Sequence, residues 1–293
     1  MRNGRTWVGV AVVGLLVSSL GCCFSGMQPV RGSGRMTEKV YAVEGFHGVA
    51  LTNQGDLTIA YGDEERLVVE AEANLLPYLE ARVEGGILHI GTRPGGWIWP
   101  TRPIRYRLTV TELDTVSVTG SGDAVGPVLE GEEISVRVTG FGDITLDGID
   151  ATDSVDIKVN GSGGARVDGD DADGASVRGE RVSVTVTGSG GVGLGEVEAD
   201  RLEVRVTGSG DLTVAGGRVK GQTISTSGSG VYRARELRSA TAEARVSGSG
   251  TVMIQVEDEL EARLTGSGDV RYAGDPAVHA NTTGSGDVVR AGD

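Results

Sequence analysis

Cysteine, aromatic residues and proline are scarce in this chain of 293 residues. Its two cysteines, Cys22 and Cys23, are adjacent near the N-terminus, so the remaining chain holds neither a disulfide framework nor thiolate ligands for zinc. The aromatic share of 4%, together with few helix-forming runs, argues against an ordinary large α/β enzyme. With 7 prolines and no Gly-X-Y period, the chain is not collagen despite its 49 glycines.

Basic residues are also in deficit. The 27 lysines and arginines against 41 aspartates and glutamates give a formal net charge of −14. This charge offers no electrostatic attraction to DNA or RNA, which argues against a nucleic-acid partner. The hydrophobic share of 38%, arranged in long valine-rich alternations, is too high for a disordered chain. We therefore expect a folded acidic protein that binds no nucleic acid.

The N-terminal residues are typical of a bacterial secretory signal. A positively charged start precedes an apolar run over residues 7–20, which is shorter than the roughly 20 residues that span a bilayer. Small and apolar residues before Cys22 are typical of the site at which a lipoprotein is cleaved and lipidated. We predict a signal peptide over residues 1–21, lipidation of Cys22 and a lipid-anchored flexible tether over residues 22–36.

This prediction places the mature protein outside the cytoplasm, attached to a membrane of the bacterial cell envelope through its lipid. It would lie at the outer membrane or on a periplasmic face. A plain secreted protein and an uncleaved N-terminal anchor are the alternatives. No later segment of the sequence is long and apolar enough to cross a membrane.

One pattern recurs from about residue 115 onward: a valine-rich alternation, a Gly-x-Gly step and a second alternation. The nine steps begin at Gly120, Gly140, Gly161, Gly188, Gly208, Gly228, Gly248, Gly266 and Gly284. They are 18 to 21 residues apart, except for one interval of 27 residues. Repetition at this period indicates a fold built by stacking copies of one unit.

The copy at residues 201–214 shows the phase of the repeat. Its even-numbered positions, from Leu202 to Val214, are apolar or glycine, whereas its odd-numbered positions, from Arg201 to Thr213, are polar or charged. A period of two is the geometry of a β-strand with one inward face. Both glycines fall on the inward phase, where a missing side chain lets the backbone approach closely or bend.

We therefore predict an all-β fold, a β-solenoid with 18 to 21 residues per coil, stacked about 4.8 Å apart. Its thin aliphatic core would leave no room for bulky aromatic side chains, which accounts for their scarcity. The long interval contains an insertion over residues 168–180, expected to be a surface loop or an extra partial coil. Hairpins in a sandwich or propeller are the alternative, but a propeller blade needs about 40 residues.

Residues 37–114 differ from the repeat and contain most of the aromatic residues. Alternating stretches suggest strands here, with a helical turn near residues 74–81. We predict that this region forms less regular coils, which cap the N-terminal end of the solenoid over residues 115–293. The C-terminus follows a repeat copy without an obvious cap, which leads to the hypothesis that two copies associate through this open end.

Several motifs occur in a set order along the chain. They are G-S-G-R at residues 32–35, F-x-x-V at residues 46–49, G-D-L-T-I at residues 55–59, N-L-L-x-x-L at residues 74–79, G-x-L-x-I around Leu88 and Ile90, and the serial V-T-G-S-G-D copies. Together they resemble the auto-transporter adhesin head GIN domain family, DUF2807, over roughly residues 32–293. The resemblance implies a right-handed parallel β-helix outside the cytoplasm, often lipid-anchored. It carries over no catalytic residues.

Five aspartates directly follow Gly-x-Gly steps and would form one outward column in stacked coils. They are Asp123, Asp143, Asp211, Asp269 and Asp287. A carboxylate column is a weak candidate for calcium, because other residues interrupt it. The competing interpretation is that the serines and aspartates satisfy backbone groups at turns. The hydroxyls of Thr207 and Ser209 would also repeat as a flat lattice, as in ice-binding solenoids, although the charged column argues against that function.

An aromatic and basic segment at residues 93–107 stands out in this acidic chain. Its candidate ligand-binding residues are Trp97, Trp99, Arg102, Arg105 and Tyr106. Aromatic residues and arginine are enriched in binding hot spots, so the segment is a candidate site for a cell-surface glycan or an envelope protein. The competing interpretation is a cap loop folded over the end of the solenoid.

The sequence offers little support for catalysis. The segment at residues 188–193 matches a dinucleotide-binding glycine pattern, but strand alternation follows it, so it is one repeat copy. The three histidines are far apart in the sequence and lack metal spacing. We predict an adhesin-like binding or structural module that has no catalytic activity and no cofactor. A β-helix enzyme acting on polysaccharide and a lipoprotein that senses or assembles envelope components are the alternatives.

Overall fold

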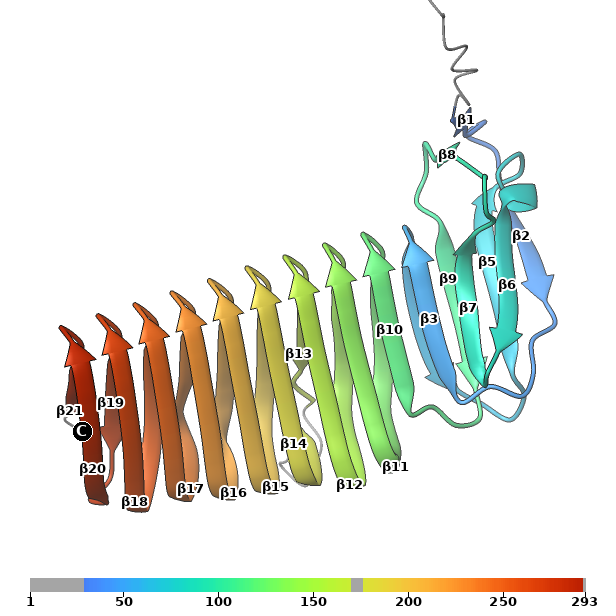
Figure 1. Cartoon of the computed structure of the whole chain (residues 1–293). Coiled ribbons are helices and arrows are strands. Elements are labelled where there is room, and N and C mark those ends of the chain that lie inside the picture. Colours follow the sequence, from blue (N-terminus) through green and yellow to red (C-terminus); the bar gives the residue numbers. More distant parts are fainter. Residues whose placement is uncertain (1–28, 170–175, 292–293) are drawn as a thin grey trace, which may run out of the picture.

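The structure is a computed structural model that describes residues 29–169 and 176–291. The predicted signal peptide and Cys22 lie outside the described residues. Strands stack side by side along one axis (Figure 1), and almost all of the described chain is strand. The predicted parallel β-solenoid is therefore confirmed.

Strands β10 to β21 form the repeated part of the stack. Their bounds are β10 Thr115–Gly120, β11 Asp123–Gly140, β12 Ile144–Gly161, β13 Gly164–Val167, β14 Val177–Gly188, β15 Gly191–Gly208, β16 Asp211–Gly228, β17 Val231–Gly248, β18 Thr251–Gly266, β19 Asp269–Ala273, β20 Ala277–Gly284 and β21 Val288–Arg290. Neighbouring coils pair in parallel with equivalent residues opposite each other, as at Gly208, Gly228 and Gly248. Each feature of one copy therefore becomes a column along the molecule.

Each Gly-x-Gly step is a sharp corner between two strands. The first glycine has a positive φ in all nine copies, for example 117° at Gly228, a region that other residues rarely adopt. A Cβ on Gly228 would also lie 2.3 Å from the carbonyl oxygen of Gly208 in the preceding coil. The second glycine, Gly230, is buried, as the inward phase predicts, whereas Gly228 is half-buried. Glycine is therefore required at the first position mainly because the backbone of the neighbouring coil lies so close, and less because the position faces the core.

Along the described residues of β10 to β21, the core is a continuous strip of aliphatic side chains with one large exception. Tyr232 of β17 is fully buried, and its hydroxyl donates to Oε1 of Gln222 at 3.2 Å. The prediction that bulky aromatics do not fit is wrong at this position. The same coil has alanine at three buried positions, Ala234, Ala242 and Ala244. These small residues compensate for the volume of the ring, because a core tolerates substitution when its total volume is kept.

The insertion in the long interval lies within one coil. Strands β13 and β14 both pair with β12 on one side and with β15 on the other. They are therefore two parts of a single coil, and residues 168–176 connect them. The described part of the insertion therefore adds no further coil to the stack. Residues 170–175 lie outside the described residues.

The N-terminal cap combines coils with antiparallel strands. Its elements are β1 Val30–Arg31, β2 Met36–Tyr41, β3 Gly48–Asn53, β4 Asp56–Tyr61, β5 Arg66–Glu72, the 3-10 turn η1 Leu76–Tyr78, β6 Leu79–Glu84, β7 Ile87–Thr92, β8 Ile98–Trp99 and β9 Arg105–Val110. Strands β3 and β4 pair in parallel with β10 and β11, so regular stacking begins near residue 48, well before the predicted boundary at residue 115. The helical turn predicted near residues 74–81 is confirmed by η1.

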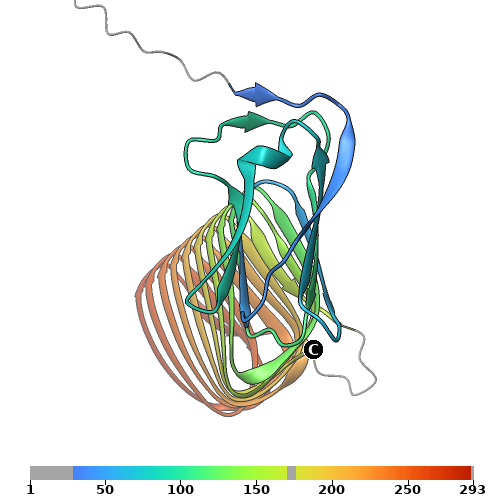
Figure 2. The same ribbon diagram turned by 90° about the vertical axis from the view of Figure 1, so that its right-hand side faces the viewer.

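Beyond β3 and β4 the cap departs from a plain series of coils. Strands β7 and β9 continue the parallel pairing, but β6, β5 and β2 then pair antiparallel. A view along the stack shows the cap at the near end, with β1 and β8 beyond the outline of the coils (Figure 2). At the other end, within the described part of the chain, β20 and β21 each pair only with the coil before them. That end presents an open strand edge.

Candidate functional site

The aromatic loop between β7 and β9 is held in place by strand pairing. Within it, β8 pairs in parallel with β1, so that Trp99 lies opposite Arg31. The backbone N–H of Val30 donates to the carbonyl oxygen of Trp97 at 2.8 Å. Ile98 is buried, whereas Trp97 and Trp99 on either side of it are 61% and 64% exposed. Strand alternation thus directs both indoles outward.

A buried carboxylate joins this loop to the N-terminal segment. Glu72, at the end of β5, is 1% exposed. Its Oε2 accepts the backbone N–H of Thr101 at 2.8 Å, and its Oε1 accepts the Thr101 hydroxyl at 2.6 Å. The backbone N–H of Gly34 also donates to Oε1. A Cβ on Gly32 would lie 1.8 Å from Oε2, so the chain at Gly32 passes directly over the carboxylate.

These hydrogen bonds set the ionisation of Glu72. Burial alone would raise the pKa of this carboxyl. The hydrogen bonds from the Thr101 hydroxyl and from the backbone of Thr101, Gly34 and Arg102 outweigh burial, so the pKa lies below its ordinary value. Glu72 is therefore an ionised internal clamp, and its charge is satisfied by groups of the loop and of the N-terminal segment.

The five predicted ligand-binding residues do not form one surface: three are exposed on the loop, one lies on β9 and one is buried. Trp97, Trp99 and Arg102 are exposed on the loop. Arg105 lies on β9, where its guanidinium is 3.4 Å from the Glu70 carboxylate. Tyr106 is 1% exposed in the core of the cap, and burial raises the pKa of its hydroxyl. Tyr106 is thus a core residue, and its inclusion in a surface site is corrected here.

The predicted aspartate column is built into the corners of the coils. Oδ1 of Asp123 accepts the backbone N–H of Asp143 at 2.9 Å, and Oδ1 of Asp143 accepts that of Gly164 at 2.6 Å. Asp211 and Asp269 accept the equivalent N–H groups of the next coils at 3.2 Å and 3.3 Å. Four of the five aspartates thus each accept a backbone N–H group, as the turn interpretation predicts. Among the described residues, no group of three or more histidine, cysteine, aspartate or glutamate side chains is arranged to hold a metal ion.

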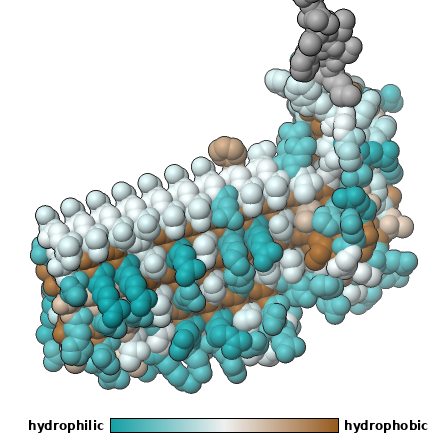
Figure 3. All heavy atoms as spheres, in the orientation of Figure 1, coloured by the Kyte–Doolittle hydropathy of each residue, from teal (hydrophilic) through white to brown (hydrophobic). Residues whose placement is uncertain are grey.

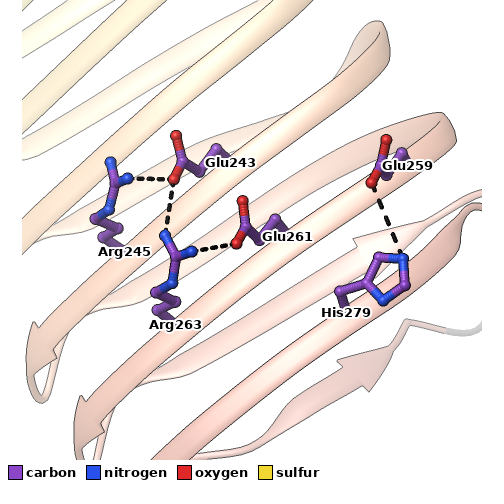
Figure 4. A network of polar contacts seen from close by, with 6 residues as sticks. All are labelled: Glu243, Arg245, Glu259, Glu261, Arg263 and His279. Carbon is purple, nitrogen blue, oxygen red and sulfur yellow. Dashed lines mark hydrogen bonds and ion pairs between the residues drawn. The ribbon is translucent and has the colours of Figure 1, made fainter.

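The broad faces of the solenoid have charged columns that neutralise each other. Rows of hydrophilic side chains run across the coils below the pale corners (Figure 3). In Figure 4, Nη1 of Arg263 lies 3.0 Å from the Glu243 carboxylate of the preceding coil, and Arg263 also contacts Glu261 on its own strand. Arg245 contacts Glu243 as well. Such exposed pairs contribute roughly 0–1 kcal/mol each, so this face is solvated and self-complementary.

Among the residues that the structure describes, the histidines His47 and His279 form no catalytic arrangement with their neighbours. Nδ1 of His47 lies 2.9 Å from Oδ2 of Asp114. The Thr115 hydroxyl donates to Asp114 and not to His47, so these groups do not follow the order nucleophile, imidazole, carboxylate. At the C-terminal end of the stack, Nε2 of His279 on β20 lies 3.9 Å from the Glu259 carboxylate. No helix in the described part of the chain is long and apolar enough to span a membrane.

Sequence reasoning missed Glu72, Asn74 and Thr101. Asn74 accepts the backbone N–H of Ser33 at 2.9 Å and donates to the carbonyl oxygen of Arg31 at 2.8 Å. The signal lay in the G-S-G-R motif at residues 32–35, whose glycines leave room for a side chain from elsewhere. Nothing in the sequence identifies that side chain as Glu72, because β5 is far from this motif in the chain.

Solved structures share this fold. The chain is similar, with 23% identity and a TM-score of 0.70, to a "putative adhesin" from Parabacteroides distasonis, with coverage of 89% of this chain and 99% of that one. A "putative lipid binding protein" from the same species has 21% identity and a TM-score of 0.64, over 90% and 100% of the two chains. A "putative adhesin" from Parabacteroides merdae has 20% identity and a TM-score of 0.62, over 89% and 99%. At these identities the likeness shows the fold alone.

A family assignment rests on the sequence itself. No curated protein matches the chain. The profile of the family described as "Putative auto-transporter adhesin, head GIN domain" matches residues 45–178 and 168–276. These two matches span the cap from β3 onward and the coils up to β19, which is most of the chain. The protein belongs to this family, DUF2807.

Proposed function

We propose that the protein is an extracytoplasmic, lipid-anchored binding module without catalytic activity, attached through Cys22 and binding at the aromatic loop of its cap. The observation that carries this proposal is the exposure of Trp97 and Trp99 at 61% and 64%, in a chain with an aromatic share of 4%. Exposed indoles on a loop fixed by strand pairing are typical of binding surfaces, because little conformational entropy is lost on contact. Membership of an adhesin-like family supports a surface role.

The rest of the molecule supports binding over catalysis. Among the described residues, four of the five corner aspartates accept backbone N–H groups, and Glu243 on the charged face is paired with arginine. Such engagement leaves them poorly suited to act as the acid and base of a polysaccharide-active enzyme, which need a substrate between them. A fold neighbour bears the description of a lipid binding protein, and surfaces and lipids are both candidate partners for the loop.

The test is retention on isolated bacterial envelopes. Cys22→Ser should release the protein from the membrane fraction. Trp97→Ala with Trp99→Ala should remove the binding of a lipid-free mature chain to envelopes without lowering its melting temperature. Phe141→Ser is the matched control, because Phe141 is 76% exposed on a corner of the solenoid. Unchanged binding by the double tryptophan variant would overturn the role of the loop.

We also propose that two copies associate through the open end of the stack. Strands β20 and β21 leave one edge unpaired within the described residues, and an unpaired edge is a template for another strand. A purely monomeric mass by light scattering of the lipid-free chain at high concentration would overturn this proposal.

A further inference from the structure

The upper part of the cap, which we call the tip, has a charge opposite to that of the protein. The tip comprises residues 29–36, 73–79 and 92–104. It contains Arg31, Arg35, Arg93 and Arg102 and has no aspartate or glutamate, in a chain whose net charge is −14. The four arginines are exposed, and none forms an ion pair with a residue that the structure describes. Glu72, which borders the tip, is buried and satisfied by the loop.

The tip is also where the chain enters the fold. The first described strand, β1, pairs with β8 directly beside Trp97 and Trp99. Residues 23–29 separate the predicted lipidation site from this point, and seven residues reach at most about 25 Å when fully extended. A lipid on Cys22 would therefore hold the tip close to the bilayer surface at all times.

The side chains of the tip suit that surface. Tryptophan prefers the boundary between acyl chains and headgroups, because its ring is apolar and its N–H is polar. Arginine binds lipid phosphate in a bidentate manner and keeps its charge. Strand pairing and the Glu72 clamp fix the loop, so the indoles do not fold back onto the cap.

We infer that the tip is a docking surface for an anionic phospholipid bilayer, with Trp97 and Trp99 inserted at the interface and the four arginines on the headgroup phosphates. This inference rests on the proposed function, since the lipid on Cys22 brings the tip to the membrane. The tip points across the stacking direction of the coils and not along it (Figure 1). Docking through the tip would place the stacking axis of the solenoid parallel to the bilayer. The faces of the coils would then remain accessible to partners close to the membrane surface.

The intrinsic fluorescence of the mature chain tests the inference. The three tryptophans of the sequence are Trp7, in the predicted signal peptide, Trp97 and Trp99, so after cleavage all indole fluorescence reports on the tip. The lipidated protein is reconstituted into phosphatidylcholine vesicles with and without phosphatidylglycerol, using acyl chains brominated to quench indole. We expect quenching and a blue shift in the anionic vesicles, both weakened by high salt. Phe141→Ser should leave the quenching unchanged.

A second measurement isolates the arginines. The lipid-free mature chain with Cys22→Ser and Cys23→Ser is sedimented with the same vesicles. Arg102→Gln should weaken binding to anionic vesicles about fivefold, since one basic residue near an anionic surface has that effect. Arg201→Gln on β15, an exposed arginine without an ion pair to any described residue, is the matched control and should have no effect.

The outcomes separate the two proposals. Vesicle-anchored protein whose indoles are not quenched would overturn membrane docking and leave the lipid anchor intact. If the indoles instead respond to added envelope polysaccharide, the loop binds glycan and the docking inference is likewise overturned. Protein that fails to float with vesicles, whether or not Cys22 is present, would overturn the proposed anchor itself. Equal weakening by Arg102→Gln and Arg201→Gln would show that only overall charge matters and would also overturn the inference.

Discussion

The coils from β10 to β21 are held by contacts that recur at every step, whereas the cap depends on contacts that occur once. In each coil, the first corner glycine lies against the carbonyl oxygen of its equivalent in the coil before. The residue after it donates its backbone N–H to that same oxygen, as Ser229 does to Gly208 at 2.8 Å. In the cap, one carboxylate, Glu72, joins two loops through its own set of donors. The contacts that stabilise the coils are therefore distributed over many copies, whereas the geometry of the tip depends on a few side chains.

The largest expected effect comes from breaking a corner. Gly228→Ala should cost about 3 to 5 kcal/mol of unfolding free energy, because a positive φ and a clash with the preceding coil act together. Its Cβ would lie 2.3 Å from the Gly208 carbonyl oxygen. Gly85 in the cap also has a positive φ, of 61°, but has nothing within 4 Å of a Cβ. Gly85→Ala should cost only about 1–2 kcal/mol.

Urea unfolding followed by circular dichroism measures both variants. Gly193→Ala on β15 is the neutral control, because its Cβ would meet open space and its φ is not positive. Equal costs for Gly228→Ala and Gly85→Ala would show that close approach of the coils does not require glycine at the corners.

The next effect concerns the clamp of the cap. Glu72→Gln replaces a charged hydrogen-bond acceptor with a neutral side chain. It should lower the free energy of local opening of residues 30–35 by about 2 kcal/mol. Because the folded pKa of Glu72 is depressed, its contribution is present above the unfolded pKa and is lost as pH falls through the folded pKa. The protection factors of the amides in the 30–35 segment, which compare each exchange rate with that of an unstructured chain at the same pH, should therefore fall in acid for the native chain by more than they fall in Glu72→Gln. Glu70→Gln on the same strand should retain the acid response.

A smaller effect, of opposite sign, is expected inside the coils. Thr226 is buried, its hydroxyl has no hydrogen-bond partner in the structure, and it lies between Val206 and Val246 in its column. Thr226→Val should stabilise the protein by about 1 kcal/mol, since it removes an unsatisfied polar group. The melting temperature measures this gain. Thr207→Val, at an exposed position, should give none, and a loss in Thr226→Val would mean that the hydroxyl is satisfied, for instance by water.

The smallest effect is expected on the charged face. Glu243→Gln removes an acceptor shared by Arg245 and Arg263, but such exposed pairs are screened by salt and should change the unfolding free energy by less than about 0.5 kcal/mol. Thermal melts at low and high salt should coincide for this variant and the native chain. A loss comparable to that of Glu72→Gln would mean that side-chain pairing between coils, like that in the cap, determines stability.

The coils could be predicted from the sequence more completely than the cap, because their contacts repeat locally. A coil is specified by local alternation and by period, so the inward phase could be predicted from residues 201–214 and the stacking from the spacing of the Gly-x-Gly steps. The fit of Tyr232 could not, because it depends on alanines elsewhere in its coil. The exposure of Trp97 and Trp99 likewise depends on pairing between β8 and β1, which are far apart in the chain. Tyr106 was misplaced because a strand can carry arginines on one side and a core aromatic on the other.

The in-register stacking of the corners has a consequence for how this protein can change over generations. Gly210 and Gly230 occupy equivalent corners, so deleting residues 211–230 would join one copy to the next with every column intact. Deletion or duplication of a whole copy can therefore shorten or lengthen the molecule by one coil, about 4.8 Å at a time. Coils that differ in length keep the same alignment, since a Cβ on Gly161, Gly188 or Gly266 would likewise meet the carbonyl oxygen of the corner glycine before it. A change of length within one coil is therefore absorbed between the corners and leaves the number of coils unchanged.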